Sequence, residues 1–135
     1  MKLSILLAGA NGMIGSFLYN RFNKDYSITA LDYSKGSIED NFFSIDLIQE
    51  ADVETFAEKS PKCYALIFLV GLAHKKGKGQ EIDEFRRINK QTLTNLLSTL
   101  DKKNKLPKKI IFASTISVYG EKINQSMYPE DSEKT

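Results

Sequence analysis

The sequence has only one cysteine and one histidine among its 135 residues. Cys63 has no second thiol to pair with, so an intramolecular disulfide is excluded and a reducing compartment such as the cytoplasm is expected. His74 stands alone, so neither a zinc site nor a serine nucleophile with a histidine base is expected. A Gly-x-Ser-x-Gly motif is also missing. These absences argue against metal centres and against hydrolases of the triad type.

The sequence also lacks a strong charge bias and a long apolar run. Its 19 basic and 17 acidic residues give a net charge of +2, which is too balanced to indicate a nucleic-acid partner. The longest apolar stretch, residues 65–73, is well short of the ~18 residues of a membrane span, so no membrane association is expected. With 41% hydrophobic and 27% charged residues, the composition is that of one globular domain.

Short apolar runs alternate with segments of helical period along the chain. Strands are expected at residues 3–8, 27–31, 42–45, 64–70 and 108–113, and helices at 13–22, 49–59 and 80–101. This alternation predicts βαβ units, in which the strands run parallel and helices cover both faces of the sheet. We therefore expect an α/β fold with a Rossmann-like, doubly wound parallel sheet of about five strands. Residues 121–135 are polar and acidic, without an apolar period, and are expected to form a loop.

A Gly-x-x-Gly-x-x-Gly motif lies between the first expected strand and the first expected helix. Gly9 permits a tight turn out of the strand, Gly12 lets the backbone approach a pyrophosphate, and Gly15 lets the helix pack closely on the sheet. The N–H groups at the helix start then favour bound phosphates. Tight turns also use glycine, but the strand–turn–helix context favours a dinucleotide site. The expected cofactor contacts in this turn are Gly9, Asn11, Gly12, Met13, Ile14 and Gly15.

Asp32 follows the second apolar run, 17 residues after Gly15. A carboxylate there can accept hydrogen bonds from the hydroxyls of the adenosine ribose, and it repels a 2′-phosphate. Asp32 therefore predicts NAD as the cofactor in preference to NADP. Two alternatives stay open: Asp32 is only a polar strand end, or nearby Lys35 holds a 2′-phosphate.

The glycine motif followed by Asp32 resembles that of the extended short-chain dehydrogenase/reductases, which include the NAD-dependent epimerases and dehydratases of nucleotide sugars. Three later segments resemble the same family: Ser44-Ile45-Asp46-Leu47, the apolar run of residues 65–73, and Ser-Thr-x-x-Val-Tyr-Gly at residues 114–120. The resemblance covers essentially the whole chain and implies that residues 1–120 form an NAD-binding domain. It also implies cofactor contacts at Asp46 and Leu47, beside the adenine, and at Val70, Gly71, Leu72 and Ser114.

The resemblance further implies roles in catalysis and structure. Thr115 falls on the family's catalytic Ser/Thr, whose hydroxyl would hydrogen-bond the substrate oxygen at the carbon that exchanges hydride. Asn89 matches an asparagine in the family's Asn-Val-x-Gly-Thr-x-Asn-Leu-Leu helix and is expected to be buried and bonded to backbone. The substrate implied is a nucleotide-linked sugar, and a homodimer of the parent protein stays open.

The sequence departs from the family in one important respect, because it contains no Tyr-x-x-x-Lys pair. The family's catalytic tyrosine would lie near position 140, so the chain is expected to stop before its acid/base pair, the remaining strands and the substrate-binding segments. We therefore expect this chain to be inactive alone. One hypothesis is the cofactor-binding part of an NAD-dependent epimerase, dehydratase or reductase. The alternative is a non-catalytic module that senses a dinucleotide and acts through a protein partner.

Overall fold

The computed structural model describes residues 2–38, 40–70 and 79–112. The expected site residues Gly71, Leu72, Ser114 and Thr115 lie outside this part of the chain, as does the expected domain boundary at residue 120. The elements, in chain order, are β1 (Ser4–Ala8), α1 (Met13–Phe22), β2 (Ser27–Asp32), β3 (Phe42–Ser44), α2 (Glu50–Lys59), β4 (Ala65–Phe68), α3 (Gly79–Lys102) and β5 (Lys109–Phe112).

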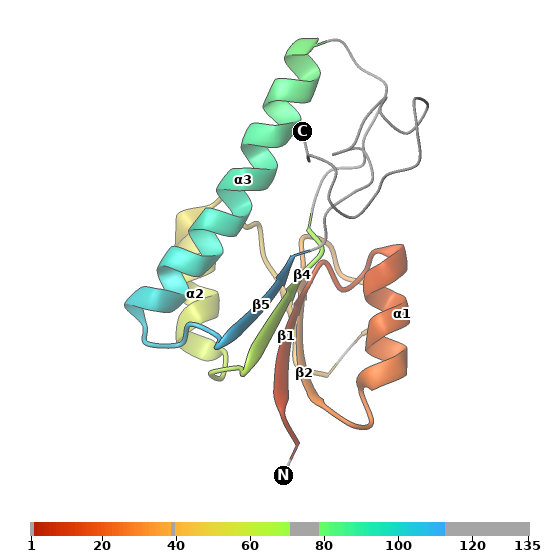
Figure 1. Cartoon of the computed structure of the whole chain (residues 1–135). Helices are drawn as coiled ribbons and strands as arrows, with labels where there is room; N and C mark the ends of the chain where they lie inside the picture. Colours follow the sequence, from red (N-terminus) through yellow and green to blue (C-terminus); the bar gives the residue numbers. More distant parts are fainter. Residues whose placement is uncertain (1, 39, 71–78, 113–135) are drawn as a thin grey trace, which may run out of the picture.

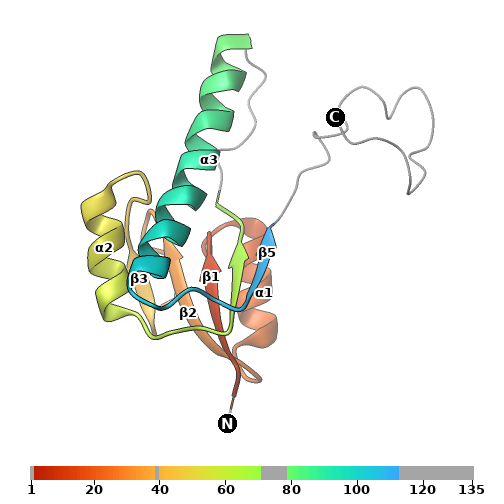
Figure 2. The same ribbon diagram turned by 60° about the vertical axis from the view of Figure 1, so that its left-hand side comes forward.

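The strands form one parallel sheet in the order β3-β2-β1-β4-β5. The chain starts in the middle of the sheet, builds outward to β3, and returns across β1 to β4 and β5. Helix α1 covers one face, and α2 and α3 lie on the other (Figure 1). The prediction of a doubly wound, five-stranded parallel sheet is confirmed. The carboxyl ends of all strands meet at one edge, and α3 extends beyond that edge (Figures 1 and 2).

Alternate residues along the central strands feed two separate apolar cores. Leu6 and Ala8 point to the α2/α3 side, while Leu7 between them points to the α1 side. The α2/α3 core is the larger of the two, because both helices add large buried side chains such as Phe56 and Leu96. This two-sided burial explains why the strands read as nearly continuous apolar runs.

Helix α1 leaves part of its apolar face exposed. Ile14 and Phe17, which recur at helical spacing in this segment, are 61% and 65% exposed. The residue that α1 buries is Gly15, so the start of this helix packs against the β1–α1 turn through backbone rather than through large side chains. The rest of the α1 side is closed by half-buried aromatics, among them Tyr19 and Phe22.

Two other differences concern strands. Asp32 belongs to β2 and pairs with Ser44 of β3, instead of following the strand. All four residues of β5 are exposed, although the sequence reads as a buried strand.

Among the described residues, no helix combines the length and the apolar character that a bilayer span requires.

Candidate functional site

The turn between β1 and α1 is held in place by backbone contacts that only glycine permits. Gly9 has a φ of +86°, and a Cβ there would lie 2.9–3.0 Å from backbone atoms of Leu69 and Val70. The N–H groups of Gly9 and Ala10 both donate to the backbone oxygen of Leu31, at 2.9 and 3.2 Å. The turn is therefore fixed against the ends of both neighbouring strands, β2 and β4.

Gly15 and Gly12 differ sharply in their surroundings. A Cβ on Gly15 would lie 2.9 Å from the Cα of Ala10, and closer still to the carbonyl oxygen of Gly9. A Cβ on Gly12 would meet only that same oxygen, at an ordinary 3.5 Å. The fold itself therefore requires glycine at position 15, whereas the described residues leave room for a side chain at position 12.

The start of α1 is open to an anion. Gly12 is the N-cap residue, no side chain caps the helix, and its first turn contains no acidic residue. Met13 and Ile14, the first two helical residues, are 92% and 61% exposed. The first N–H groups of a helix have no partner within the helix and carry a partial positive charge, which suits a phosphate.

Asp32 lies beside this turn at the end of β2. Its Oδ2 accepts a hydrogen bond from the backbone N–H of Asn11 at 2.8 Å, and its Oδ1 accepts one from that of Tyr33 at 2.7 Å. The carboxylate is half-buried and its orientation is fixed. A carboxylate offers about four acceptor positions, so both oxygens can still accept a hydrogen bond from a ligand.

The segment after β3 forms the next part of the same edge. Asp46 accepts a hydrogen bond from the backbone N–H of Ile48 at 3.0 Å, and its own N–H donates to Oδ2 of Asp52 at 3.3 Å. Leu47 is buried in the α2/α3 core. Asp46 and Leu47 therefore form a turn with fixed backbone, at the carboxyl edge that also carries Asp32.

Sequence reasoning missed the residue that holds this turn. Asn95 of α3 is buried, and its Nδ2 donates to the backbone oxygens of Leu47 and Ile48, at 2.9 and 3.4 Å. Asn89, which was expected to be the buried asparagine of this helix, is half-buried. The signal in the sequence was the position of Asn95 directly before the buried Leu96, where a polar side chain needs a partner.

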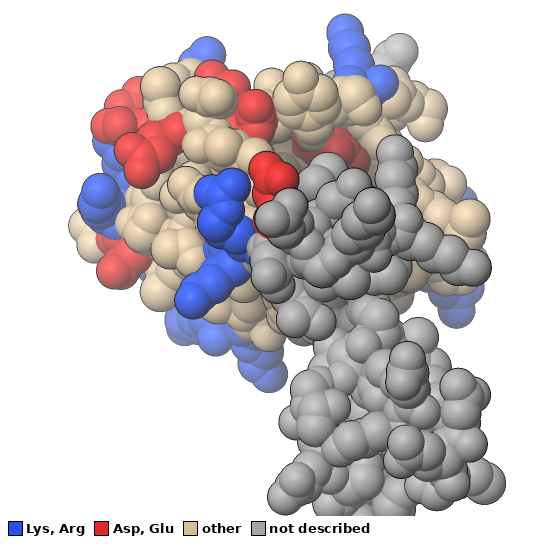
Figure 3. Space-filling view, turned by 90° about the horizontal axis from the view of Figure 1, so that it is seen from above, with Lys and Arg blue, Asp and Glu red and all other residues tan. Residues whose placement is uncertain are grey.

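The structure thus brings the described site residues to one edge of the sheet. The glycine turn follows β1, Asp32 ends β2, Asp46 and Leu47 follow β3, and the half-buried Val70 follows β4. Figure 3 looks toward this edge, where basic and acidic side chains are interspersed over the visible surface. A crevice at the carboxyl ends of parallel strands is where open α/β sheets bind their ligands.

Two other kinds of site find no support in the described parts of the chain. No group of three or more His, Cys, Asp or Glu side chains could hold a metal ion there. A hollow of about 290 Å³ lies at the opposite, amino end of the sheet, lined by residues that include Lys2, Tyr26 and Asp40. It has no contact with the glycine turn.

Comparison with known proteins places this geometry in a family. Residues 5–135 match the NAD-dependent epimerase/dehydratase family. The search of curated proteins gives no match. Among solved structures, the UDP-Glc/GlcNAc 4-epimerase of Campylobacter jejuni is 32% identical over 88% of this chain, with a TM-score of 0.72.

Two further epimerase structures show the same fold. The UDP-N-acetylglucosamine 4-epimerase of Bacillus cereus has a TM-score of 0.74 and 23% identity over 99% of this chain. The UDP-glucose 4-epimerase of Bifidobacterium longum, solved with NAD+ and UDP, has a TM-score of 0.69 and 26% identity over 87% of this chain. The chain spans 42%, 39% and 38% of the Bacillus, Campylobacter and Bifidobacterium proteins. The match over residues 5–135 and the five-stranded sheet with its glycine turn together establish that this chain belongs to the NAD-dependent epimerase/dehydratase family.

Proposed function

We propose that this chain is the cofactor-binding part of an NAD-dependent enzyme that acts on a nucleotide-linked sugar by hydride transfer. The observation that carries the proposal is the combination of Gly12, where the described residues leave room for a ligand, with the uncapped start of α1. Nothing in the described fold requires glycine at position 12, and the missing side chain allows a phosphate to approach the backbone at the start of the helix. The family to which the chain belongs makes that ligand a nicotinamide dinucleotide.

The residues at the carboxyl edge fit the parts of such a cofactor. The turn from Gly9 to Gly15 would hold the pyrophosphate, and Asp32 would accept hydrogen bonds from the adenosine ribose. Asp46 and Leu47 would lie at the adenine. Bound NAD supplies a hydride acceptor, whereas this chain supplies binding and orientation.

The sugar and its chemistry are inferred from relatives. Several of the neighbouring structures are of epimerases of UDP-linked sugars, so we propose a nucleotide-linked sugar as the substrate here. Thr115 would orient the substrate oxygen, with Ser114, Val70, Gly71 and Leu72 beside the cofactor.

The preference for NAD over NADP can be tested at Asp32. A hydrogen bond to a charged group contributes about 1.5–3 kcal/mol, so Asp32→Ala should weaken NAD binding by about 10- to 150-fold and reduce the preference over NADP. Asp32→Asn keeps the shape and should also reduce the preference. Asp25→Ala, which removes an exposed carboxylate from the loop after α1, is the matched control.

Calorimetric titration of the unmutated chain with both cofactors decides the matter. Tighter binding of NAD supports the role of Asp32. Equal or tighter binding of NADP would overturn it and point to Lys35 as a partner of the 2′-phosphate. Binding of neither cofactor would overturn the proposed function itself.

A second candidate function uses the same cofactor site: a non-catalytic module would bind NAD and signal through a protein partner. The Tyr-x-x-x-Lys pair of the family is expected near position 140, so its absence from the 135 residues does not separate the two candidates. Cofactor binding is common to both candidates, so only turnover separates them.

A further inference from the structure

Asn11 links the glycine turn to the loop that follows β2. Its side-chain Nδ2 donates a hydrogen bond to the backbone oxygen of Ser34, and its backbone N–H donates to Oδ2 of Asp32 at 2.8 Å. One half-buried residue therefore contacts both the carboxylate proposed to bind the ribose and the loop beyond it. Its side chain and its backbone make these two contacts separately.

Gly36 completes this contact from the far end of the loop. A Cβ on Gly36 would lie 2.9 Å from Nδ2 of Asn11, and closer still to its Oδ1 and Cγ. The backbone of Gly36 is outside the left-handed region, so a Cβ here would be opposed only by the Asn11 side chain and not by the backbone conformation. We call Asn11, Ser34 and Gly36 the latch.

Lys35 lies between the two latched residues of this loop. It is exposed, and it is the only basic residue between Asp32 and Asp40. An ammonium group at this place in the sequence is a natural partner for a phosphate on the adenosine ribose. Asn11 holds the backbone before Lys35 through the hydrogen bond to Ser34, and its amide packs closely against Gly36 after Lys35. This arrangement limits how far the loop can move toward that phosphate.

We infer that Asn11 is a specificity-determining residue that selects an adenosine ribose with a free 2′-hydroxyl. With the latch closed, the oriented Asp32 carboxylate accepts from ribose hydroxyls and repels a 2′-phosphate. With the latch open, the loop is free to shift and Lys35 can pair with a 2′-phosphate. This inference rests on the proposed function, because it concerns the ribose of the proposed cofactor.

The test uses the whole chain and calorimetric titration with NAD and with NADP. Asn11→Ala removes the side chain but keeps the backbone N–H that Asp32 accepts. A neutral hydrogen bond is worth up to about a tenfold change in affinity, so we expect NAD to bind about 3- to 10-fold more weakly, with NADP binding unchanged or tighter. Adding Lys35→Ala to the Asn11→Ala variant should lower its affinity for NADP and restore part of the preference for NAD. Asn23→Ala, at the exposed far end of α1, is the control.

Gly36→Ala opens the latch from the other side. The added Cβ should displace the Asn11 amide and reduce the preference for NAD over NADP, as Asn11→Ala does. The double variant Asn11→Ala/Gly36→Ala should bind NAD no more weakly than Asn11→Ala alone. Equal weakening of both cofactors in Asn11→Ala, or additive losses in the double variant, would overturn the inference. If the unmutated chain binds NAD and the Asn11→Ala variant keeps the preference for NAD over NADP, only the inference about Asn11 is wrong. If the unmutated chain binds neither cofactor, the proposed function is wrong, and so is the inference about Asn11 that rests on it.

Discussion

The three glycines of the β1–α1 turn are subject to different constraints. At Gly9, the positive φ and the close approach to Leu69 require glycine. At Gly15, a Cβ would overlap the backbone of the turn, so a side chain has no space there. Gly12 meets no such constraint from the described chain. A mutation at each position therefore separates what the fold requires from what a ligand requires.

Gly12→Val should abolish cofactor binding and leave the fold intact. The new side chain would occupy the open space at the start of α1, where the pyrophosphate is proposed to lie. The free energy of unfolding of the Gly12→Val variant should change by less than about 1 kcal/mol, because the added Cβ meets only one atom of the described chain, at ordinary contact distance. Thermal unfolding and NAD titration measure the two effects separately.

Gly15→Val is the matched comparison. Its Cβ would overlap the backbone of Gly9 and Ala10, so unfolding free energy should fall by about 3 kcal/mol or more. A Gly12→Val protein that binds NAD normally would contradict the phosphate assignment. A Gly15→Val protein of normal stability would contradict the packing described for α1.

Cys63 should be chemically inert in the folded protein. It is 4% exposed, and burial raises the pKa of its thiol, only partly offset by hydrogen bonds with Thr29 and Ser4. Because the unfolded thiol ionises first as pH rises, this residue contributes stability at neutral pH that is lost in alkaline solution. The structure therefore predicts slow labelling by a thiol reagent at pH 8, and rapid labelling after denaturation. Comparable rates before and after denaturation would show that the thiol is accessible.

At the scale of elements, helix α3 holds the turn of Asp46 and Leu47 through Asn95. Asn95→Leu keeps the approximate volume but leaves the backbone oxygen of Leu47 without its donor, which should lower the free energy of unfolding by about 1–3 kcal/mol. The substitution should also weaken NAD binding, because the turn that contains Asp46 loses the hydrogen bond from Asn95. Gln91→Leu, four residues earlier on α3 and exposed, is the comparison variant. Equal NAD affinity in Asn95→Leu and the unmutated chain would mean that the turn does not depend on α3.

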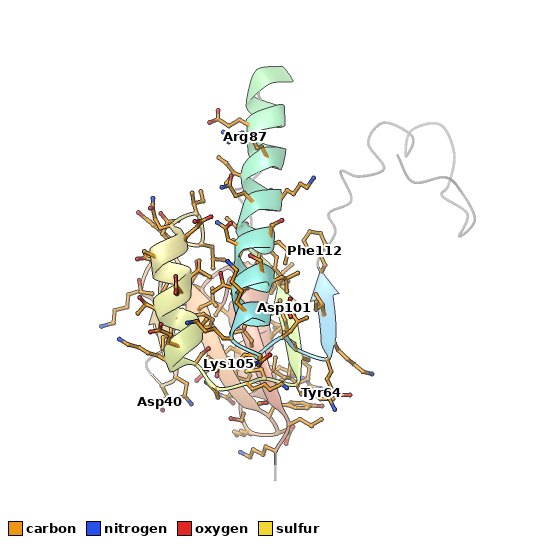
Figure 4. All side chains as sticks on the ribbon, turned by 90° about the vertical axis from the view of Figure 1, so that its left-hand side faces the viewer. Asp40, Tyr64, Arg87, Asp101, Lys105 and Phe112 are labelled. Atoms are coloured by element: carbon orange, nitrogen blue, oxygen red, sulfur yellow. The ribbon has the colours of Figure 1, made fainter. Side chains whose placement is uncertain are left out.

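Helices α2 and α3 are joined at their carboxyl ends by Lys105. Asn104 adopts a positive φ after α3, and the chain then turns so that Nζ of Lys105 donates to the backbone oxygens of Ala57, Glu58 and Ser60, at 2.6, 3.2 and 2.7 Å (Figure 4). These oxygens are the ones that the end of α2 leaves without helical partners. Lys105 therefore has a structural role at the end of α2.

Lys105→Met should lower the free energy of unfolding by about 2 kcal/mol, because three carbonyls lose a charged donor. Lys102→Met, an exposed neighbour at the end of α3, should change stability by less than about 0.5 kcal/mol. Urea unfolding of the two variants checks this difference. Equal losses in both would mean that general charge, and not the cap on α2, explains the effect.

The sequence predicted the elements well because their signals are local. Val53, Phe56 and Ala57 recur at helical spacing, and all three are buried in α2 as expected. The exposure of Phe17 and the anchor at Asn95 could not be predicted in the same way. Both depend on contacts between segments far apart in the chain, namely the packing of Gly15 against the turn and the approach of α3 to the loop after β3.

At the scale of the whole molecule, the two faces of the sheet are covered unequally. The α2/α3 side contains most of the buried apolar residues, while Ile14 and Phe17 on α1 and Ile111 on β5 are each more than half exposed. Phe112 stacks on Phe68 yet is itself 54% exposed (Figure 4). In the described part of the chain, the α2/α3 face of the sheet is therefore covered more fully than the α1 face.

The last prediction is that residues 1–135 alone do not transfer hydride at a measurable rate. No tyrosine in the sequence is followed four residues later by a lysine, the spacing that puts a phenol and an ammonium on one helix face. General acid–base catalysis contributes about 10²- to 10⁴-fold, so its loss should leave turnover near background. The assay is NADH absorbance with a panel of nucleotide sugars, and NAD titration of the same preparation controls for folding. Turnover by residues 1–135 would contradict the prediction and require a different base, with Tyr128 the first residue to test. Activity that appears only when a segment carrying Tyr-x-x-x-Lys is added would favour the enzyme over the sensing module, because a sensor needs cofactor binding but no proton transfer.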